Sequence, residues 1–154
     1  MISKSSKGFS LIELLVVVGI VGILAAIGTV SYQGYVKSSK RTAAQNIVQQ
    51  TALAQTEEYS NAGSYILTEA LGDGAAIRSA ECEASSASSD AIEDGLFSGD
   101  DIITSQIKFE MCVVGNTSTY KVIAKEYDKS DPYEWSGCEI SLVRNSLPER
   151  NDSC

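Results

Sequence analysis

The sequence contains no histidine, only two prolines and a single tryptophan. Without histidine it lacks the commonest general base and the commonest metal ligand of proteins. Its four cysteines form no Cys-x-x-Cys pair, so a zinc site would need an unusual set of ligands. No glycine-rich loop carries the Lys-Ser/Thr of a phosphate-binding loop. These absences argue against an enzyme and against a bound cofactor or metal.

Basic residues are scarce in the middle of the chain. Residues 61–105 hold nine acidic side chains and one basic side chain, Arg78, and the net charge of the whole chain is −8. Such a surface repels nucleic acid, which argues against a nucleic-acid partner on electrostatic grounds. A local basic patch would have to come from four residues of the last third: Lys121, Lys125, Lys129 and Arg144.

The acidic residues of this middle region also raise the alternative of a calcium site. The carboxylates between Asp90 and Asp94, and the pair Asp100-Asp101, lack the ligand spacing of an EF-hand. We interpret them as solvated loop carboxylates.

In contrast to the acidic middle region, the N-terminal part of the chain contains one long hydrophobic run. Between Phe9 and Gly28 only Ser10 and Glu13 have polar side chains. About 20 residues in a helix reach roughly 30 Å, enough to cross a bilayer. A carboxylate inside such a span costs several kcal/mol unless a cation neutralises it, so Glu13 requires a partner.

The residues around this run limit what it can be. Lys4 and Lys7 precede it, which predicts a cytoplasmic start and an exported remainder. An ordinary signal peptide would need an A-x-A-like cleavage site, for which residues 26–28 are only a loose match. A plain membrane anchor has no use for Glu13, and neither has a signal peptide.

The junction at the start of the run resembles a known family. Gly8 is followed by Phe9, Ser10, Leu11, Ile12, Glu13, Leu14 and Leu15. This pattern is similar to the type IV pilins and their type II secretion pseudopilin relatives. The resemblance implies that a prepilin peptidase removes residues 1–8 and N-methylates Phe9. It also implies that residues 9–30 are a transmembrane and assembly helix.

The same resemblance implies partners and a location. The protein would be held in the inner membrane by a single pass with a periplasmic C-terminal head, and would pass through an assembly platform into an extracellular pilus of similar subunits. Cleavage at Gly8 would create an α-amino cation on Phe9, and methylation keeps that charge. We expect this cation, on the same or a neighbouring subunit, to pair with Glu13 and to set the stagger between helices.

The next segment changes to amphipathic helical spacing. Residues 31–60 carry one helical face, while three basic residues on the other side are expected to be solvated. Helix-stopping residues follow at 60–64, so one helix is predicted from about Ser10 to Tyr59. The expected face is Tyr32, Tyr35, Val36, Ala43, Ile47, Thr51 and Ala54, and the basic residues are Lys37, Lys40 and Arg41.

The remaining residues, 61–154, predict a globular head. Residues 61–105 have low hydrophobicity and are expected to be a connecting loop, with 106–154 forming an antiparallel sheet. Alternation over 106–114, its repeat from Tyr120 and a third run over 137–143 indicate three strands, which the amphipathic half of the helix would cover. The predicted fold is α+β. Trp135, Tyr127 and Tyr133 are interpreted as sheet packing.

The cysteines predict two disulfides in an oxidising compartment, and four cysteines allow three pairings. We favour Cys138–Cys154, which resembles the C-terminal disulfide loop of pilins. We also favour Cys82–Cys112, which would pin the otherwise loose acidic connection to the sheet.

The interpretation that fits these features best is a non-enzymatic structural subunit of a type IV pilus, serving adhesion, motility or uptake, as a major or a minor pilin. Three alternatives stay open: a type II secretion pseudopilin, a minor pilin for DNA uptake and a membrane-anchored binding module. Four cysteines count against the pseudopilin, and the acidic balance counts against DNA capture.

Overall fold

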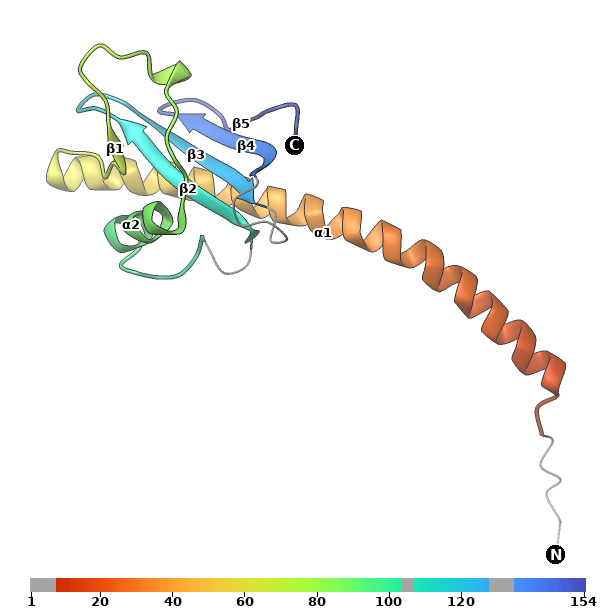
Figure 1. The fold of residues 1–154 in the computed structure, drawn as a ribbon. Helices are drawn as coiled ribbons and strands as arrows, with labels where there is room; N and C mark the ends of the chain where they lie inside the picture. The colour runs from red at the N-terminus through yellow and green to blue at the C-terminus, as the bar shows by residue number, and fades with distance from the viewer. Residues whose placement is uncertain (1–7, 104–106, 128–134) are drawn as a thin grey trace, which may run out of the picture. The chain divides into compact units, whose positions relative to one another are not determined.

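The computed structural model describes residues 8–103, 107–127 and 135–154 (Figure 1). The chain divides into two compact units, Met1–Ser38 and Ser39–Cys154. The helix α1, Leu11–Ala62, contributes residues to both units.

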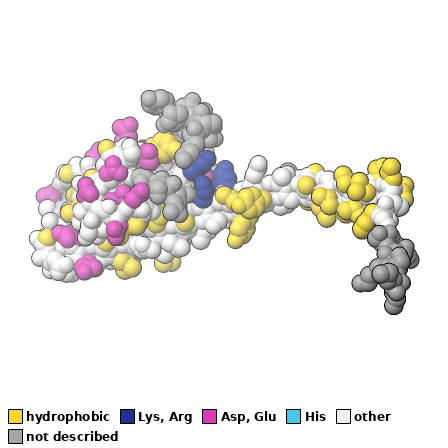
Figure 2. Space-filling model, turned by 90° about the horizontal axis from the view of Figure 1, so that it is seen from below, with side chains coloured by type: hydrophobic (Ala, Val, Ile, Leu, Met, Phe, Trp, Pro, Cys, Tyr) yellow, Lys and Arg dark blue, Asp and Glu magenta, His cyan; other side chains and the backbone are white. Residues whose placement is uncertain are grey.

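In the first unit, α1 begins with a local cap. The hydroxyl of Ser10 accepts a hydrogen bond from the Glu13 backbone N–H (3.3 Å), and the Ser10 carbonyl accepts one from Leu14 (3.2 Å). The helix then continues without interruption through Gly19, Gly22 and Gly28. Its large hydrophobic side chains from Leu11 to Ile27 are all more than half exposed, and Figure 2 shows them gathered along this stretch.

In the second unit, α1 packs one face against the sheet. Ala44, Ile47, Val48, Thr51 and Gln55 are buried, and their spacing of three and four residues places them on one side of the helix. The helix ends at Ala62, before Gly63, which has a φ of +74° and donates its N–H to the Tyr59 carbonyl (2.9 Å). Glycine adopts this left-handed conformation without strain.

The sheet has five strands in the order β1-β2-β3-β4-β5. Its pairs β2–β3, β3–β4 and β4–β5 are antiparallel, whereas β1 pairs with β2 in parallel. The strands are β1 Glu69–Ala70, β2 Phe109–Gly115, β3 Tyr120–Tyr127, β4 Trp135–Val143 and β5 Glu149–Arg150. The predicted α+β head is confirmed, with one parallel pair added to the antiparallel sheet.

The two faces of the sheet belong to two hydrophobic clusters. Met111, Ala124 and Ile140 lie side by side in the register and pack with the buried residues of α1. Cys112, Val114 and Ile123 lie on the opposite face, and Cys82 and Ala84 complete their cluster. Alternation along β2 and β3 therefore serves two covered faces rather than one covered and one solvated face.

Residues 61–105, which were expected to be a connecting loop, include regular secondary structure. They contain β1, the 3-10 turn η1 Ile77–Ser79 and the helix α2 Ser86–Leu96. Ser85 and Ser88 form a reciprocal capping box at the start of α2, in which each hydroxyl accepts the other residue's backbone N–H. A serine-rich segment of low hydrophobicity resembles a loop in sequence, but these serines are helix caps.

Candidate functional site

The predicted processing and assembly residues lie at the start of α1. Phe9 precedes the helix and is 79% exposed, and Glu13 is the acidic residue of the first turn. Glu13 is also exposed and forms no ion pair with any cation in the described part of the chain. A carboxylate near a helix N-terminus is favoured by the helix dipole, but that interaction does not neutralise it in an apolar surrounding. In an apolar surrounding, the Glu13 carboxylate would therefore still need a cation from outside the described residues.

The surface around Glu13 is hydrophobic on all sides of the helix. Leu11, Ile12, Leu14 and Leu15 are each more than 60% exposed. By length and composition α1 can cross a membrane, a property that signal sequences and the core helices of soluble proteins share. None of its most apolar window is buried, so in this chain the surface has no protein partner among the described residues.

The head contains both favoured disulfides. Cys82 bonds to Cys112 with their Cα atoms 6.2 Å apart, and Cys138 bonds to Cys154 with a Cα separation of 4.5 Å. The first joins the segment before α2 to the middle of β2, and the second joins β4 to the residue that follows the turn after β5.

Arg41 is not on a solvated helix face, which corrects the prediction for the basic trio. Its guanidinium donates to Glu126 Oε2 from Nη2 (2.9 Å) and from Nε (3.2 Å), and it also bonds the backbone carbonyl of Cys154. The Arg41 and Glu126 side chains are only 11% and 9% exposed. This ion pair connects α1, β3 and the disulfide-closed C-terminal segment, whereas Lys37 is exposed as predicted.

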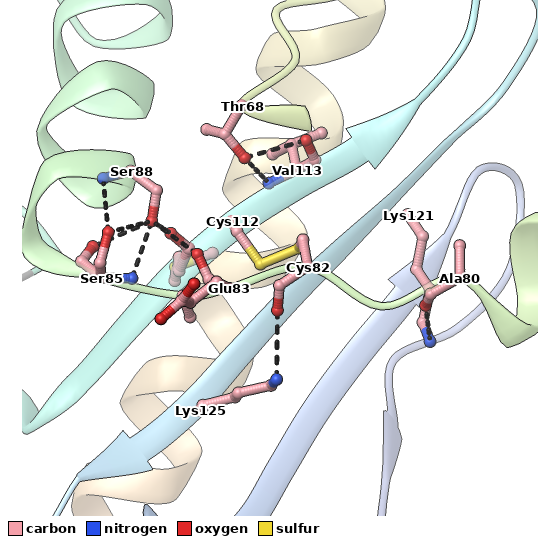
Figure 3. The surroundings of a disulfide bond; sticks show 12 residues. Thr68, Ala80, Cys82, Glu83, Ser85, Ser88, Cys112, Val113, Lys121 and Lys125 are labelled. Atoms are coloured by element: carbon pink, nitrogen blue, oxygen red, sulfur yellow. Dashed lines mark hydrogen bonds between the residues drawn. A yellow bond between two sulfur atoms is a disulfide. The ribbon is translucent and has the colours of Figure 1, made fainter. Parts of the chain in front are cut away.

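The basic patch suggested for nucleic acid does not form from Lys121 and Lys125. Lys121 Nζ donates to the carbonyls of Ala80 (3.0 Å) and Arg78 (3.3 Å), and Lys125 Nζ donates to the carbonyl of Cys82 (3.1 Å). Figure 3 shows both lysines directed at the chain segment that carries Cys82. Lys129, the third member of the suggested patch, lies outside the described residues.

The middle carboxylates are not all solvated either. Glu93 is 4% exposed, and its Oε1 accepts the backbone N–H groups of Ile102 (2.7 Å) and Ile103 (2.6 Å). It therefore anchors the chain that follows α2, while Asp90 and Asp94 are exposed. Across the parts of the chain that the structure describes, no three acidic or cysteine side chains converge as a metal site would require.

Of the three aromatic residues assigned to sheet packing, Tyr127 lies at the end of β3 and its hydroxyl donates to the Ala84 carbonyl (2.7 Å). Burial raises the pKa of this phenol above its usual value, and the neighbouring Glu110 and Glu83 carboxylates raise it further. The backbone of Trp135 pairs with Tyr127 in the β3–β4 register. Tyr133 lies outside the described residues.

Two features of the head were missed in the sequence. The Gln55 amide exchanges two hydrogen bonds with the backbone of Ile66, and so holds the chain that leaves α1. The Arg144 guanidinium lies 6.0 Å and 5.7 Å from the ring centres of Tyr59 and Tyr65, which stack on each other. The sequence signal for Gln55 is its place four residues after Thr51 on the buried face of α1.

Known proteins resemble this chain in its N-terminal part. The family profile of the prokaryotic N-terminal methylation motif matches residues 3–29. The chain is 44% identical over 63 residues to the fimbrial protein EcpC of Eikenella corrodens, a match that covers 41% of each chain. It is 42% identical over 59 residues to the type IV major pilin protein PilE1 of Neisseria gonorrhoeae, covering 38% of this chain and 36% of that protein.

A third relative is the type IV major alpha-pilin of Moraxella bovis, 53% identical over 39 residues, or 25% of this chain and 24% of that one. These matches span less than half of the relatives' length, and no solved structure matches the chain. The shared part holds Gly8, Phe9 and Glu13. The chain thus resembles the type IV pilins: it carries the N-terminal methylation motif of a prepilin-type signal, the relatives that match this part are named as type IV pilins and fimbrial proteins, and its long helix with a disulfide-bonded sheet fits the type IV pilin fold.

Proposed function

We propose that this chain is a structural, non-enzymatic subunit of a type IV pilus, polymerised through its N-terminal helix. The observation that carries the proposal is the solvent-exposed hydrophobic surface of α1, which bears a single carboxylate one turn after the Gly8–Phe9 junction. A surface of this size on a water-exposed helix needs either a bilayer or other helices around it. A filament whose core is made of such helices supplies the second environment, and the inner membrane supplies the first.

The proposed mechanism of assembly depends on the partner of Glu13. Removal of residues 1–8 by a prepilin peptidase leaves an N-methylated α-amino cation on Phe9, four residues before Glu13. In an apolar filament core, the cation of one subunit pairs with the Glu13 carboxylate of its neighbour and satisfies both charges. Because a buried charge without a partner costs several kcal/mol, only one axial stagger between neighbouring helices is stable.

The same proposal places the protein before assembly. The helix over 9–30 crosses the inner membrane once, with the head in the periplasm, where the two disulfides are stable. An assembly platform in the inner membrane then extracts the subunit into the growing pilus. The other components encoded with this subunit determine whether the pilus serves adhesion, motility or uptake. They also determine whether the subunit is a major or a minor pilin.

The alternatives find less support. A DNA-uptake pilin needs a positive surface, but Lys121 and Lys125 are hydrogen-bonded to backbone carbonyls and the segment around Arg78 is acidic. A tethered binding module has no use for a carboxylate at Glu13. A secretion pseudopilin shares the N-terminal motif, but the relatives with the same motif are named as pilins and fimbrial proteins.

The first test is the replacement Glu13→Gln in the cell of origin, compared with Glu57→Gln on the exposed part of the same helix. We expect Glu13→Gln to leave the subunit in the inner membrane while its amount in sheared filaments falls at least tenfold, since one partner of a buried ion pair is worth about 3–5 kcal/mol. Glu57→Gln should assemble normally. Normal assembly of the Glu13→Gln subunit would contradict the charge-pair mechanism.

The second test is mass spectrometry of the mature protein purified from membranes and from filaments. The proposal expects a first residue of methylated Phe9 in both. A chain that starts at Met1, or that is cleaved beyond Ala26, excludes prepilin processing and leaves a membrane-anchored or secreted head.

A further inference from the structure

A segment of 14 residues crosses the outer face of the sheet, the face opposite α1. We call residues 71–84 the strap; it leads from β1 through η1 to the start of α2. Its inward residues Leu71, Ala80, Cys82 and Ala84 cluster with Cys112, Val114 and Ile123 of β2 and β3. In Figure 1 the strap is the green chain between β1 and α2. It covers the outer face, as the full burial of the three sheet residues shows.

The non-covalent contacts of the strap come mainly from three side chains of β3. Lys121 donates to the carbonyls of Arg78 and Ala80, Lys125 to that of Cys82, and Tyr127 to that of Ala84. All four bonds end on backbone carbonyls, which every residue type provides. The inward side chains of the strap are small apart from Leu71, so the apolar area that it buries is small as well.

We propose that the Cys82–Cys112 disulfide is a latch that closes the strap over the sheet as a separate step in the maturation of the head. In the open form, the two thiols lose two protons and two electrons to a protein or small-molecule disulfide, which becomes the corresponding dithiol. The new bond forms by thiolate exchange through a mixed disulfide with that oxidant. Closure then shields the product, since Cys82 is 6% exposed and Cys112 is fully buried.

The division of the hydrophobic residues makes an open form of the head possible. The cluster between α1 and the inner face contains none of the residues of the outer cluster. Opening of the strap therefore exposes Val114 and Ile123 but leaves the packing of Ile47, Val48 and Met111 intact. The latch thus controls the outer face of the head and not its fold, and this holds whether or not the protein is a pilus subunit.

Trypsin can report the state of the strap because Arg78 is the only basic residue between Arg41 and Lys108. In the closed strap the Arg78–Ser79 peptide lies within η1: the Arg78 carbonyl accepts a bond from Lys121 Nζ, and the Ser79 N–H donates to Ala76 (3.2 Å). A protease needs this bond in an extended conformation. Cleavage at Arg78 therefore measures opening.

The experiment compares the full-length protein in detergent micelles with two variants, Cys82→Ala/Cys112→Ala and, as the matched control, Cys138→Ala/Cys154→Ala. Cleavage is followed by mass spectrometry at Arg78 and, as a measure of global unfolding, at Lys121 and Lys125 of β3. A cross-link across 30 residues shifts an opening equilibrium on the order of 100-fold. We expect the first variant to be cut at Arg78 about 100-fold faster, with β3 still protected, and the control to be cut at Arg78 at the wild-type rate.

Two results would overturn the proposal. If the first variant is cut at Arg78 no faster than the wild type, the strap closes without its disulfide and there is no latch. If Lys121 and Lys125 become cleavable together with Arg78, the bond supports the whole head and the strap is not an independent element.

Discussion

Replacement of Arg41 by methionine tests the packing of the head most directly. The substitution keeps an unbranched, helix-compatible side chain and removes only the guanidinium. Glu126 then loses two hydrogen bonds, and the carbonyl of Cys154 loses one. Among the described residues, the Ser136 hydroxyl still donates to the Glu126 carboxylate, at 3.1 Å.

The size of the loss follows from the burial of the pair. Breaking a buried ion pair by removing one partner typically costs 3–5 kcal/mol, because the other charge stays buried without compensation. Since the two side chains keep 11% and 9% of their surface exposed, we expect the lower end, about 3 kcal/mol. For a head of about 115 residues, that lowers the melting temperature by about 10 °C.

The assay is urea unfolding of the full-length protein in detergent, with its disulfides intact and with the fluorescence of its single tryptophan as the signal. Lys37→Met is the control, because it removes an exposed positive charge from the same helix and should change the free energy of unfolding by no more than about 0.5 kcal/mol. Adding Glu126→Gln to Arg41→Met should restore about 2 kcal/mol, since the orphaned charge is then removed. A loss below about 1 kcal/mol for Arg41→Met, or strictly additive effects in the double variant, would refute the reasoning.

Three further predictions concern buried polar groups. Thr51 Oγ1 is buried and has no hydrogen-bond partner among the described residues, so Thr51→Val should raise the free energy of unfolding in urea by about 1 kcal/mol. Gln55→Leu should lower it by about 2 kcal/mol, because both backbone hydrogen bonds to Ile66 are lost. Burial raises the pKa of the Tyr120 phenol above its usual value of 10, even though the Thr56 hydroxyl lowers it. The folded state therefore holds its proton more tightly: the stability from this group is complete below pH 10 and is lost as the pH rises through the raised pKa. Tyr120→Phe should remove this part of the alkaline loss in thermal melts. In ultraviolet absorbance it should show one late-titrating tyrosine fewer than the wild type, in which the pKa of Tyr127 is raised as well.

The N-terminal segment could be interpreted from sequence because its motif depends only on spacing along the chain and not on contacts between distant residues. Gly8, Phe9 and Glu13 stand at fixed distances in a run that is otherwise apolar, and the physical need of a carboxylate for a cation does not depend on the fold. The hairpin of β2 and β3 was predictable for a similar reason, since its period of two survives in both strands.

The helix α2 was missed because it contains few large hydrophobic residues. Ile92 is its one large buried hydrophobic residue, and its other buried positions, Ser89 and Glu93, are polar. Both find their partners in distant backbone: Ser89 Oγ accepts the N–H of Met111, and Glu93 accepts those of Ile102 and Ile103. A window of sequence around α2 contains none of these partners, so its polarity resembles that of a loop.

The prediction that Arg41 is solvated was wrong for a similar reason, because its partner also lies far away in the sequence. On a helical wheel it lies one turn after the exposed Lys37, and the local pattern assigns it to water. Glu126 is 85 residues away, and it reaches Arg41 only because β3 packs on α1. The position of a charged residue on a helix face therefore indicates where it points, but not whether water or another element meets it there.

For the outer face of β3, however, the sequence did contain the features that predict a covering segment. Ile123 stands between Lys121 and Lys125, which suggests a strand face in contact with water. Yet Cys112 lies opposite Ile123 in the register, and its disulfide to Cys82 requires the chain at residue 82 to run within a few ångströms of that face. A backbone held there brings carbonyl groups that need donors, and lysine is a side chain long enough to supply them while its stem stays on the sheet. Once the pairing of Cys82 with Cys112 is accepted, the two lysines predict a covering segment rather than a charged surface.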